Sequence, residues 1–282
     1  AAAAASTPGS RWRQARRREW RRRRGLNSTA EYEAELADAL EEAWVAYGTD
    51  RAAWGHGYVW AYARVLARGL RAAPRRILEV GIGFDREASA HFPARARGAG
   101  LLAWRDVFPE AEIVGYDVQP DTLLPALARV RTFLCDATQP APGPSPPVDG
   151  VGCPRWPPAT FDLVVDDGAH DAASQVAAFV ELHGLLREGG FHIIEDVRRA
   201  SWPVFEPLVV MGQATWNRTA PVGPFNDGVD DSHVVVVRKS FVPSDVEAVQ
   251  GWSGWAAHLL AICPEELGEG LPAWCKWVVG TS

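Results

Sequence analysis

The fold is decided by three consecutive stretches, FDLVVDDGAHD (161–171), AASQVAAFVELHGLLREGG (172–190) and FHIIEDV (191–197). The first and third contain short apolar runs that end abruptly in acids, which is typical of buried parallel strands. Apolar residues at helical spacing from Val176 to Leu186 predict a helix between them, ended by Gly189-Gly190. Parallel neighbours lie about 4.8 Å apart, so acids at two adjacent strand tips can share one small cation. Ligands of open α/β sheets bind at this same edge.

Further strand-like runs stand on both sides of this unit, and helical patterns alternate with them. They are Arg76–Gly83, Ile113–Asp117, a weaker one at Thr132–Asp136, and the β-branched run Ser232–Val237. Strands that alternate with helices indicate an α/β protein with right-handed crossovers. We therefore predict a Rossmann-like, doubly wound, mostly parallel sheet.

Composition and periodicity divide the chain into four parts. We expect a disordered Arg-rich arm (1–25), a helical N-terminal cap (26–73), a Rossmann-like domain (74–240) and a C-terminal helical extension (241–282). The cap begins at a capping-box pattern, Ser28-Thr29-Ala30-Glu31. Proline pairs predict a loop over 138–159, and short helices are expected near 244–249 and 255–262.

The charge of the chain is unevenly distributed. Residues 1–25 hold nine Arg and one acid, so the remaining residues carry a net charge of −14 in a chain whose total is −6. An acidic body of this kind is a poor match for a phosphate backbone, and we do not expect nucleic acid as a partner. No apolar run approaches the roughly 18 residues of a membrane span.

The arm and the cysteines bear on the compartment. The arm resembles an organellar transit peptide, although a basic linker or a solvated tail fits the same composition. Four Cys residues form no CxxC pair and no zinc spacing. We therefore expect no disulfide scaffold, and a reducing compartment, cytoplasmic or organellar.

A glycine turn follows the strand at Arg76, in the pattern Glu79-x-Gly81-x-Gly83. Such glycines let the backbone approach a ligand closely. Arg86 stands where the third glycine of a dinucleotide fingerprint would fall. With Asp117 and Asp136 at the ends of the next two strands, the pattern favours an adenosine ligand without a pyrophosphate, namely S-adenosylmethionine; a purely structural turn is the alternative.

At this point the motifs resemble a known family. LEVGIG (78–83), WRDVFPEAEIVGYDV (104–118), VVDDGAH (164–170) and IIEDV (193–197) are similar to metal-dependent O-methyltransferases that modify sugars on macrolides. YGTDRAAWGHGY (47–58) resembles the segment that precedes their methyltransferase domain. The resemblance covers residues 44–198, and DDGxH followed by ED is its distinctive part.

The resemblance implies a class I, S-adenosylmethionine-dependent methyltransferase that uses Mg²⁺. Its metal ligands match Asp167, Glu195 and Asp196, and its catalytic base matches His170. The remaining matches are to cofactor-binding residues: Glu79, Gly81 and Gly83 in the loop, Asp117 at the ribose, and Asp136 near the adenine. It also implies a small-molecule acceptor that carries a sugar, and self-association.

The residue types suit this chemistry without the analogy. Carboxylate ligands with open positions fit Mg²⁺ or Mn²⁺ better than Zn²⁺. Such an ion can hold a sugar hydroxyl and lower its pKa. The intrinsic pKa of His170 lets it accept that proton near neutral pH.

Several positions have other interpretations. We expect Asp166 to cap the next helix or support its neighbours, and His183 and His192 to be structural. Arg198 and Arg199 replace a short polar pair of the family, which would suit a more acidic acceptor. The alternative functions are a metal-independent small-molecule or protein methyltransferase, a non-catalytic S-adenosylmethionine-binding protein acting through the basic arm, and an Fe(II)-dependent hydroxylase-like relative.

Overall fold

The computed structural model describes residues 28–70, 72–87, 94–139, 150–201, 203–205, 214–218 and 233–239. The Arg-rich arm and the helices predicted near 244–249 and 255–262 lie outside the described residues, as do residues 140–149 of the Pro-rich loop.

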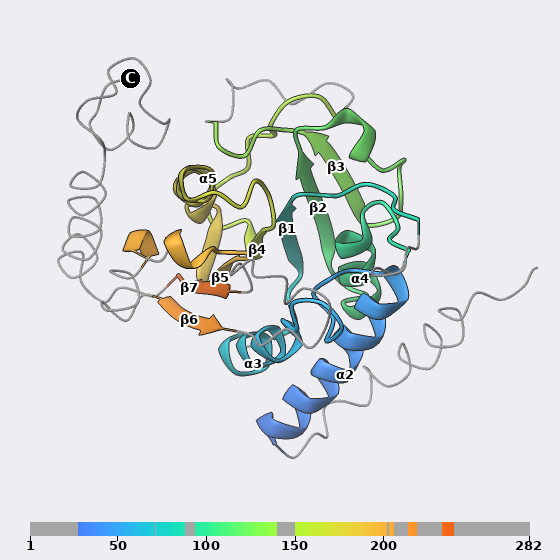
Figure 1. Ribbon diagram of the computed structural model, residues 1–282, viewed down its shortest axis with the longest axis vertical. Helices are drawn as coiled ribbons and strands as arrows, with labels where there is room; N and C mark the ends of the chain where they lie inside the picture. The colour runs from blue at the N-terminus through green and yellow to red at the C-terminus, as the bar shows by residue number, and fades with distance from the viewer. Residues whose placement is uncertain are drawn as a thin grey trace, which may run out of the picture.

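A seven-stranded sheet forms the centre of the described part, in the order β3-β2-β1-β4-β5-β7-β6 (Figure 1). Strands β1 to β5 are parallel, whereas β7 is antiparallel to both β5 and β6. This confirms the predicted doubly wound, mostly parallel α/β fold. The strands are β1 (Arg76–Val80), β2 (Glu112–Asp117), β3 (Val130–Leu134), β4 (Phe161–Asp166), β5 (Leu186–Ile194), β6 (Ala214–Arg218) and β7 (His233–Arg238).

The junction between α5 (Ala172–His183) and β5 differs from the sequence prediction. The helix ends at His183, and Leu186 already pairs with Phe161 of β4 across an irregularity in the register. Gly189 has φ +80°, and a Cβ on Gly190 would lie 2.9 Å from the carbonyl oxygens of Arg187 and Asp162. The glycine pair therefore lies within a strand and does not end the helix. Helical and strand periodicity cannot be separated over so short an apolar run.

Helices cover both faces of the sheet (Figure 1). Helix α5 packs on one face through Val176 and Phe179. The other face carries α2 (Thr29–Tyr47), α3 (Val59–Gly69) and α4 (Ala99–Val107). Among the described helices, none has both the length and the apolar character needed to cross a bilayer.

The N-terminal cap shares one continuous core with the sheet. Its first helix starts where the Ser28 hydroxyl accepts a hydrogen bond from the Glu31 amide, as the capping-box pattern predicts. The rings of Trp44, Tyr62 and Trp104 then meet edge to face or tilted, with centroids 5.4 to 5.7 Å apart. This aromatic contact joins α2, α3 and α4, and it places the segment between α2 and α3 over the strand tips.

Candidate active site

Three neighbouring strands, β1, β4 and β5, end side by side at one edge of the sheet. Val80 is in register with Asp166, which is in register with Ile194. The chain continues beyond each tip with backbone hydrogen bonds to the neighbouring strand, from the Asp167 amide to Val80 (3.0 Å) and from the Glu195 amide to Asp166 (2.9 Å). The acids that come after β4 and β5 are therefore held at fixed positions.

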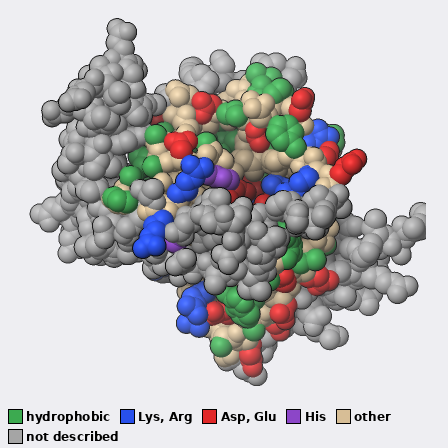
Figure 2. Space-filling model, in the orientation of Figure 1, with side chains coloured by type: hydrophobic (Ala, Val, Ile, Leu, Met, Phe, Trp, Pro, Cys, Tyr) green, Lys and Arg blue, Asp and Glu red, His purple; other side chains and the backbone are tan. Residues whose placement is uncertain are grey.

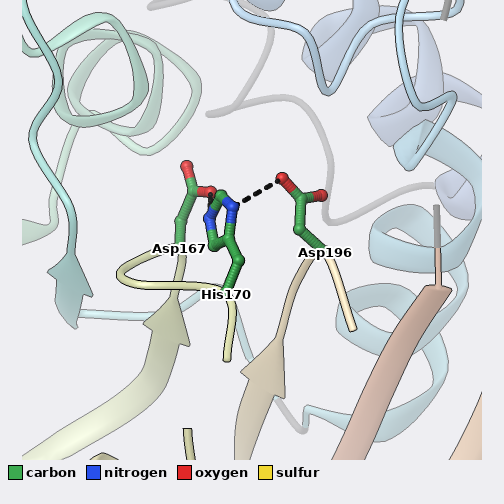
Figure 3. Close-up of side chains that lie close together, drawn as sticks. All are labelled: Asp167, His170 and Asp196. Atoms are coloured by element: carbon green, nitrogen blue, oxygen red, sulfur yellow. Dashed lines mark hydrogen bonds and ion pairs between the residues drawn. The ribbon is translucent and has the colours of Figure 1, made fainter. Parts of the chain in front are cut away.

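Asp167, His170 and Asp196 form a compact group at this edge (Figure 3). Each offers one ligand atom, and these atoms all lie within 4.8 Å of one another. The His170 ring lies between the two carboxylates, with Nε2 3.2 Å from Oδ1 of Asp167 and Nδ1 3.6 Å from Oδ2 of Asp196. Of the predicted metal ligands and base, the structure brings these three together.

Glu195 lies deeper than the other two predicted ligands. Nε of Arg51 donates to both of its carboxylate oxygens, at 2.9 and 2.7 Å, and the Tyr62 hydroxyl donates to Oε1 at 2.6 Å. The same guanidinium reaches Glu79 (3.2 Å) and Asp167 (2.9 Å). The motif pattern alone does not single out Arg51, although the segment YGTDRAAWGHGY contains it.

Electrostatics distinguish the members of the group. Burial would raise the pKa of Asp167, but Arg51 and His170 lower it to about 2. Burial would lower the pKa of His170, but its hydrogen bond to Asp167 and the charges of Asp167 and Asp196 raise it to about 10. Burial and the charge of Asp167 raise the pKa of Asp196 to about 6. Without a compensating cation, His170 is therefore an imidazolium held between carboxylates.

A hollow of about 320 Å³ adjoins this group and extends over the tips of β1, β2 and β3. Three predicted cofactor residues line it: Gly81, Asp117 and Asp136. Gly81 has φ +87°, and a Cβ there would lie 2.0 Å from the Asp167 carbonyl oxygen. Oδ2 of Asp117 accepts a hydrogen bond from the Ile82 amide at 2.8 Å, which fixes the carboxylate at the rim. The size is at the lower end for a small-molecule site.

The other two predicted cofactor residues lie elsewhere. Glu79 is 1% exposed, and its carboxylate accepts hydrogen bonds from Arg51 and the Trp104 indole. Gly83, with φ +73°, lies against the guanidinium of Arg95.

In Figure 2, this face shows a hollow with acidic and histidine side chains inside and basic side chains on two sides.

Asp166 has a larger part in the hollow than we expected from the sequence. It lines the hollow and is 3% exposed. Oδ1 accepts from the Gly168 amide at 3.2 Å, whereas Oδ2 has no hydrogen-bond partner among the described residues. Burial raises the pKa of Asp166 to about 7. Buried polar atoms are nearly always hydrogen-bonded, so Oδ2 of Asp166 is a candidate to bind a polar group of a ligand.

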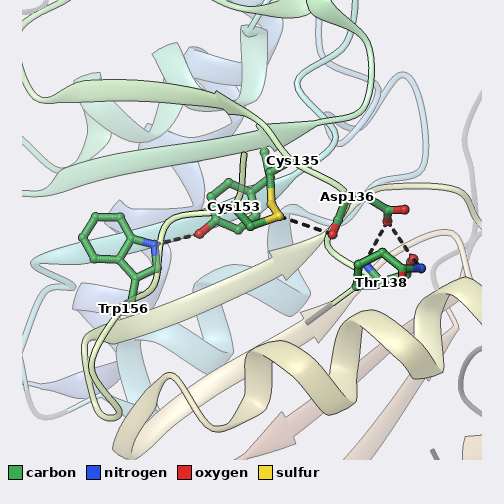
Figure 4. Close-up of a disulfide and its surroundings, with 7 residues drawn as sticks. Cys135, Asp136, Thr138, Cys153 and Trp156 are labelled. Carbon is green, nitrogen blue, oxygen red and sulfur yellow. Dashed lines mark hydrogen bonds between the residues drawn. A yellow bond between two sulfur atoms is a disulfide. The ribbon is translucent and has the colours of Figure 1, made fainter. Parts of the chain in front are cut away.

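A disulfide joins Cys135 to Cys153 beside the hollow (Figure 4). Cys135 lies just beyond β3 and lines the hollow together with Asp136 and Ala137. Cys153 belongs to the part of the Pro-rich loop that the structure describes, where Trp156 donates to the Tyr116 hydroxyl at 2.7 Å. Cysteine spacing did not predict this pair, because the two residues are 18 positions apart without a recognised motif.

Comparison with known proteins bears on what this site does. The sequence is 31% identical over 162 residues to 8-demethyl-8-alpha-L-rhamnosyl tetracenomycin-C 2'-O-methyltransferase of Streptomyces olivaceus. It is also 31% identical, over 138 residues, to mycinamicin VI 2''-O-methyltransferase of Micromonospora griseorubida. The chain is similar to sugar O-methyltransferases. The resemblance that its motifs indicate is thereby confirmed.

The extent of these similarities is limited. The two matches cover 57% and 49% of this chain but 38% and 31% of the relatives, so the chain spans less than two fifths of their length. No protein-family model matches the sequence. Among solved structures, the MycE methyltransferase in complex with Mg and SAH is 20% identical, with a TM-score of 0.47 over 73% of this chain and 57% of that one.

Proposed function

We propose that this chain is an S-adenosylmethionine-dependent, Mg²⁺-assisted O-methyltransferase that acts on a hydroxyl of a sugar or a glycosylated small molecule. One observation carries the proposal: Gly168 and Ala169, which connect Asp167 to His170, line the same hollow as Gly81, Asp117 and Asp136. An acid–base group and an adenosine-sized hollow at one sheet edge are what methyl transfer to a hydroxyl requires. The similarity to sugar O-methyltransferases supports the acceptor class.

The donor set fits a divalent cation. The ligand atoms of the group lie within 4.8 Å of one another, and carboxylate oxygens are the ligands that Mg²⁺ and Mn²⁺ prefer. Asp167 and Asp196 would hold the ion. When bound, it would supply Lewis acidity that lowers the pKa of an acceptor hydroxyl.

The chain's own residues supply the rest of the chemistry. His170 is placed to accept the hydroxyl proton, and Asp167 orients its ring through the 3.2 Å contact to Nε2. Only a neutral imidazole can accept a proton. The charges of Asp167 and Asp196 raise the pKa of His170, so a cation bound to these carboxylates would have to offset them.

The hollow positions the methyl donor. Gly81 lines the hollow and packs its backbone on the Asp167 carbonyl, and Asp117 at the end of β2 can accept hydrogen bonds from ribose hydroxyls. Oδ2 of Asp166 offers an acceptor for the amino group of the donor's amino-acid end. Fixing donor and acceptor together is the main contribution of such a site to the rate.

The test combines binding and turnover. Isothermal titration with S-adenosylhomocysteine should show one site, and methyl transfer from labelled S-adenosylmethionine to glycosylated acceptors should require Mg²⁺ and stop with EDTA. Asp167→Asn should abolish turnover. The matched control is Glu188→Gln, which changes an exposed acid near the start of β5, away from the strand tips. Absence of nucleoside binding would overturn the proposal, and turnover that survives EDTA would favour a metal-independent methyltransferase.

A further inference from the structure

We propose that Arg95 binds the methyl donor, and that its guanidinium holds the carboxylate of the donor's amino-acid end. The inference deepens the proposed function and rests on it, because it presupposes that the donor occupies the hollow. The sequence motifs did not single out Arg95, which belongs to the inserted stretch between the glycine turn and α4.

The donor's amino-acid end brings a carboxylate into strongly acidic surroundings. Asp117, Asp136 and Asp166 line the hollow, and Asp167 directly precedes Gly168, which also lines it. These acids suit the ammonium group of an amino acid, but they repel its carboxylate. Binding of the whole donor therefore requires a cation close to the glycine turn and the tip of β4.

The guanidinium of Arg95 lies at that place. A Cβ on Gly83 would be 2.5 Å from Nη2 and 3.0 Å from Cζ of Arg95, so the guanidinium rests directly on the backbone of the turn. Gly81, two residues earlier in the same turn, packs on the Asp167 carbonyl. Burial would raise the pKa of Asp167, but neighbouring cations lower it to about 2, and Arg95 is one of them. The positive charge thus lies near both the turn and the strand tip.

The backbone of Arg95 is held firmly, whereas its side chain has donors to spare. Two backbone hydrogen bonds of 2.8 Å join it to Arg86, and the next amide, of Ala96, donates to the Tyr47 carbonyl at 3.2 Å. Nη1 is 3.8 Å from Oδ2 of Asp50, which is too long for a hydrogen bond. Nε has no hydrogen-bond partner among the described residues. A guanidinium with unused donors can bind a carboxylate through two parallel hydrogen bonds.

Two other arginines near the turn are already engaged. All three guanidinium nitrogens of Arg51 donate to buried acids. Nη1 of Arg97 donates to the Asp121 carbonyl at 2.7 Å. Of these three arginines, Arg95 alone combines a place on the glycine turn with unused donors.

A pair of ligands that differ only in the carboxylate tests the inference. S-adenosylhomocysteine and its decarboxylated form are titrated calorimetrically into the full chain, without metal or acceptor. The wild type should bind S-adenosylhomocysteine more tightly by about tenfold or more, because a hydrogen-bonded ion pair is lost with the carboxylate. In Arg95→Gln this preference should fall to within about twofold, through loss of affinity for S-adenosylhomocysteine alone.

Two further variants control for charge and for general effects on the turn. Arg95→Lys should keep part of the preference, because the charge remains but the second parallel hydrogen bond is lost. Arg97→Gln removes a guanidinium two residues away and should keep the full preference of the wild type. Thermal unfolding of each variant shows whether it is folded.

The inference is overturned if the wild type does not distinguish the two ligands, or if Arg95→Gln distinguishes them as well as the wild type does. Equal weakening of both ligands in Arg95→Gln would show that Arg95 only supports the turn, and would also overturn it. Should Arg95→Gln fail to fold, Arg95→Lys decides, since its preference must then lie below that of the wild type. A wild type that binds neither ligand would overturn the proposed function too, whereas binding with a preference independent of Arg95 would overturn the inference alone.

Discussion

His170 and Asp196 face each other across the tips of β4 and β5, with Nδ1 3.6 Å from Oδ2, and both adopt left-handed backbone conformations, with φ +57° and +50°. Such conformations cost free energy in residues other than glycine, and they persist only where the surroundings hold them. Here the hydrogen bonds of Tyr58 to Asp196 and the contact of His170 with Asp167 do so. The relationship depends on folding and is the basis of the chemistry we propose.

His170→Asn should abolish most methyl transfer without preventing cofactor binding. Asparagine tolerates the left-handed backbone at this position better than alanine, so the substitution removes the imidazole with little backbone strain. Loss of a general base lowers kcat by about 10² to 10⁴-fold. Single-turnover kinetics and titration with S-adenosylhomocysteine measure the two properties separately. A kcat within a factor of a few of the wild type would exclude His170 as the base.

Gly81→Ala should weaken cofactor binding by about tenfold or more, equivalent to about 1.4 kcal/mol. The added Cβ would lie 2.0 Å from the Asp167 carbonyl oxygen, and φ is +87°. The turn must therefore move, and the hollow and the Asp167 carboxylate move with it. The control is Gly184→Ala, at the end of α5, where φ is −61° and a Cβ would meet nothing within 4 Å. Equal affinities in the two variants would contradict the prediction.

Loss of the Cys135–Cys153 disulfide should lower stability and loosen the hollow. Closing a loop of this length constrains the unfolded chain by about 3 kcal/mol. Urea unfolding of Cys135→Ser/Cys153→Ser should show a loss of that order, and titration should show weaker binding of S-adenosylhomocysteine, because Cys135 lines the hollow. Dithiothreitol should reproduce both effects in the wild type and add nothing in the double variant. If reduction leaves unfolding unchanged, the disulfide has no stabilising role.

Acidification should destabilise the protein through His192. The residue is fully buried between β4 and β7, neither ring nitrogen has a hydrogen-bond partner among the described residues, and its ring lies 6.1 Å from that of His183. Burial and the neighbouring His183 hold the pKa of His192 well below its ordinary value, and burial with the charge of Lys239 lowers the pKa of His183 to about 4.

The direction of the effect is set by proton binding. Below pH 6.5 the unfolded chain binds protons that the folded His192 does not, so stability falls as pH falls. Urea unfolding at pH 7.5 and pH 5 should show a smaller loss for His192→Leu than for the wild type. Asp166, whose raised pKa acts in the opposite direction, is common to both proteins and cancels in the comparison. Equal losses would show that His192 does not contribute.

The acids at the strand ends were the part of the site that the sequence predicted most directly. A buried apolar run that ends in acids places those acids at a sheet edge, and the parallel order brings the tips of β4 and β5 together. The pattern did not show which acids face the ligand space. Asp166 and Asp167 are adjacent, yet Asp166 is buried and lines the hollow, whereas Asp167 contacts His170.

Sequence patterns were also less reliable where the same spacing of apolar residues fits both a helix and a strand. Leu185-Leu186 fits both helical and strand spacing, and pairing with Phe161 decides for the strand. The edge strand β6 was not predicted, because the alternation of apolar and polar residues in ATWNR runs over only four positions, Ala214 to Asn217. Tertiary pairing with β7 forms that strand.

By itself, the sequence determined the order of strands β1 to β5 and β7, the glycine turn at Gly81, and the acids at the strand tips, because these depend on residues close together in the chain. Only the tertiary structure decided the roles of those acids. Arg51 and Tyr58 lie 116 to 144 residues from the acids after β4 and β5 that they contact, Asp167, Glu195 and Asp196. A carboxylate's role depends on the charge and the donors around it, and folding alone brings those groups together.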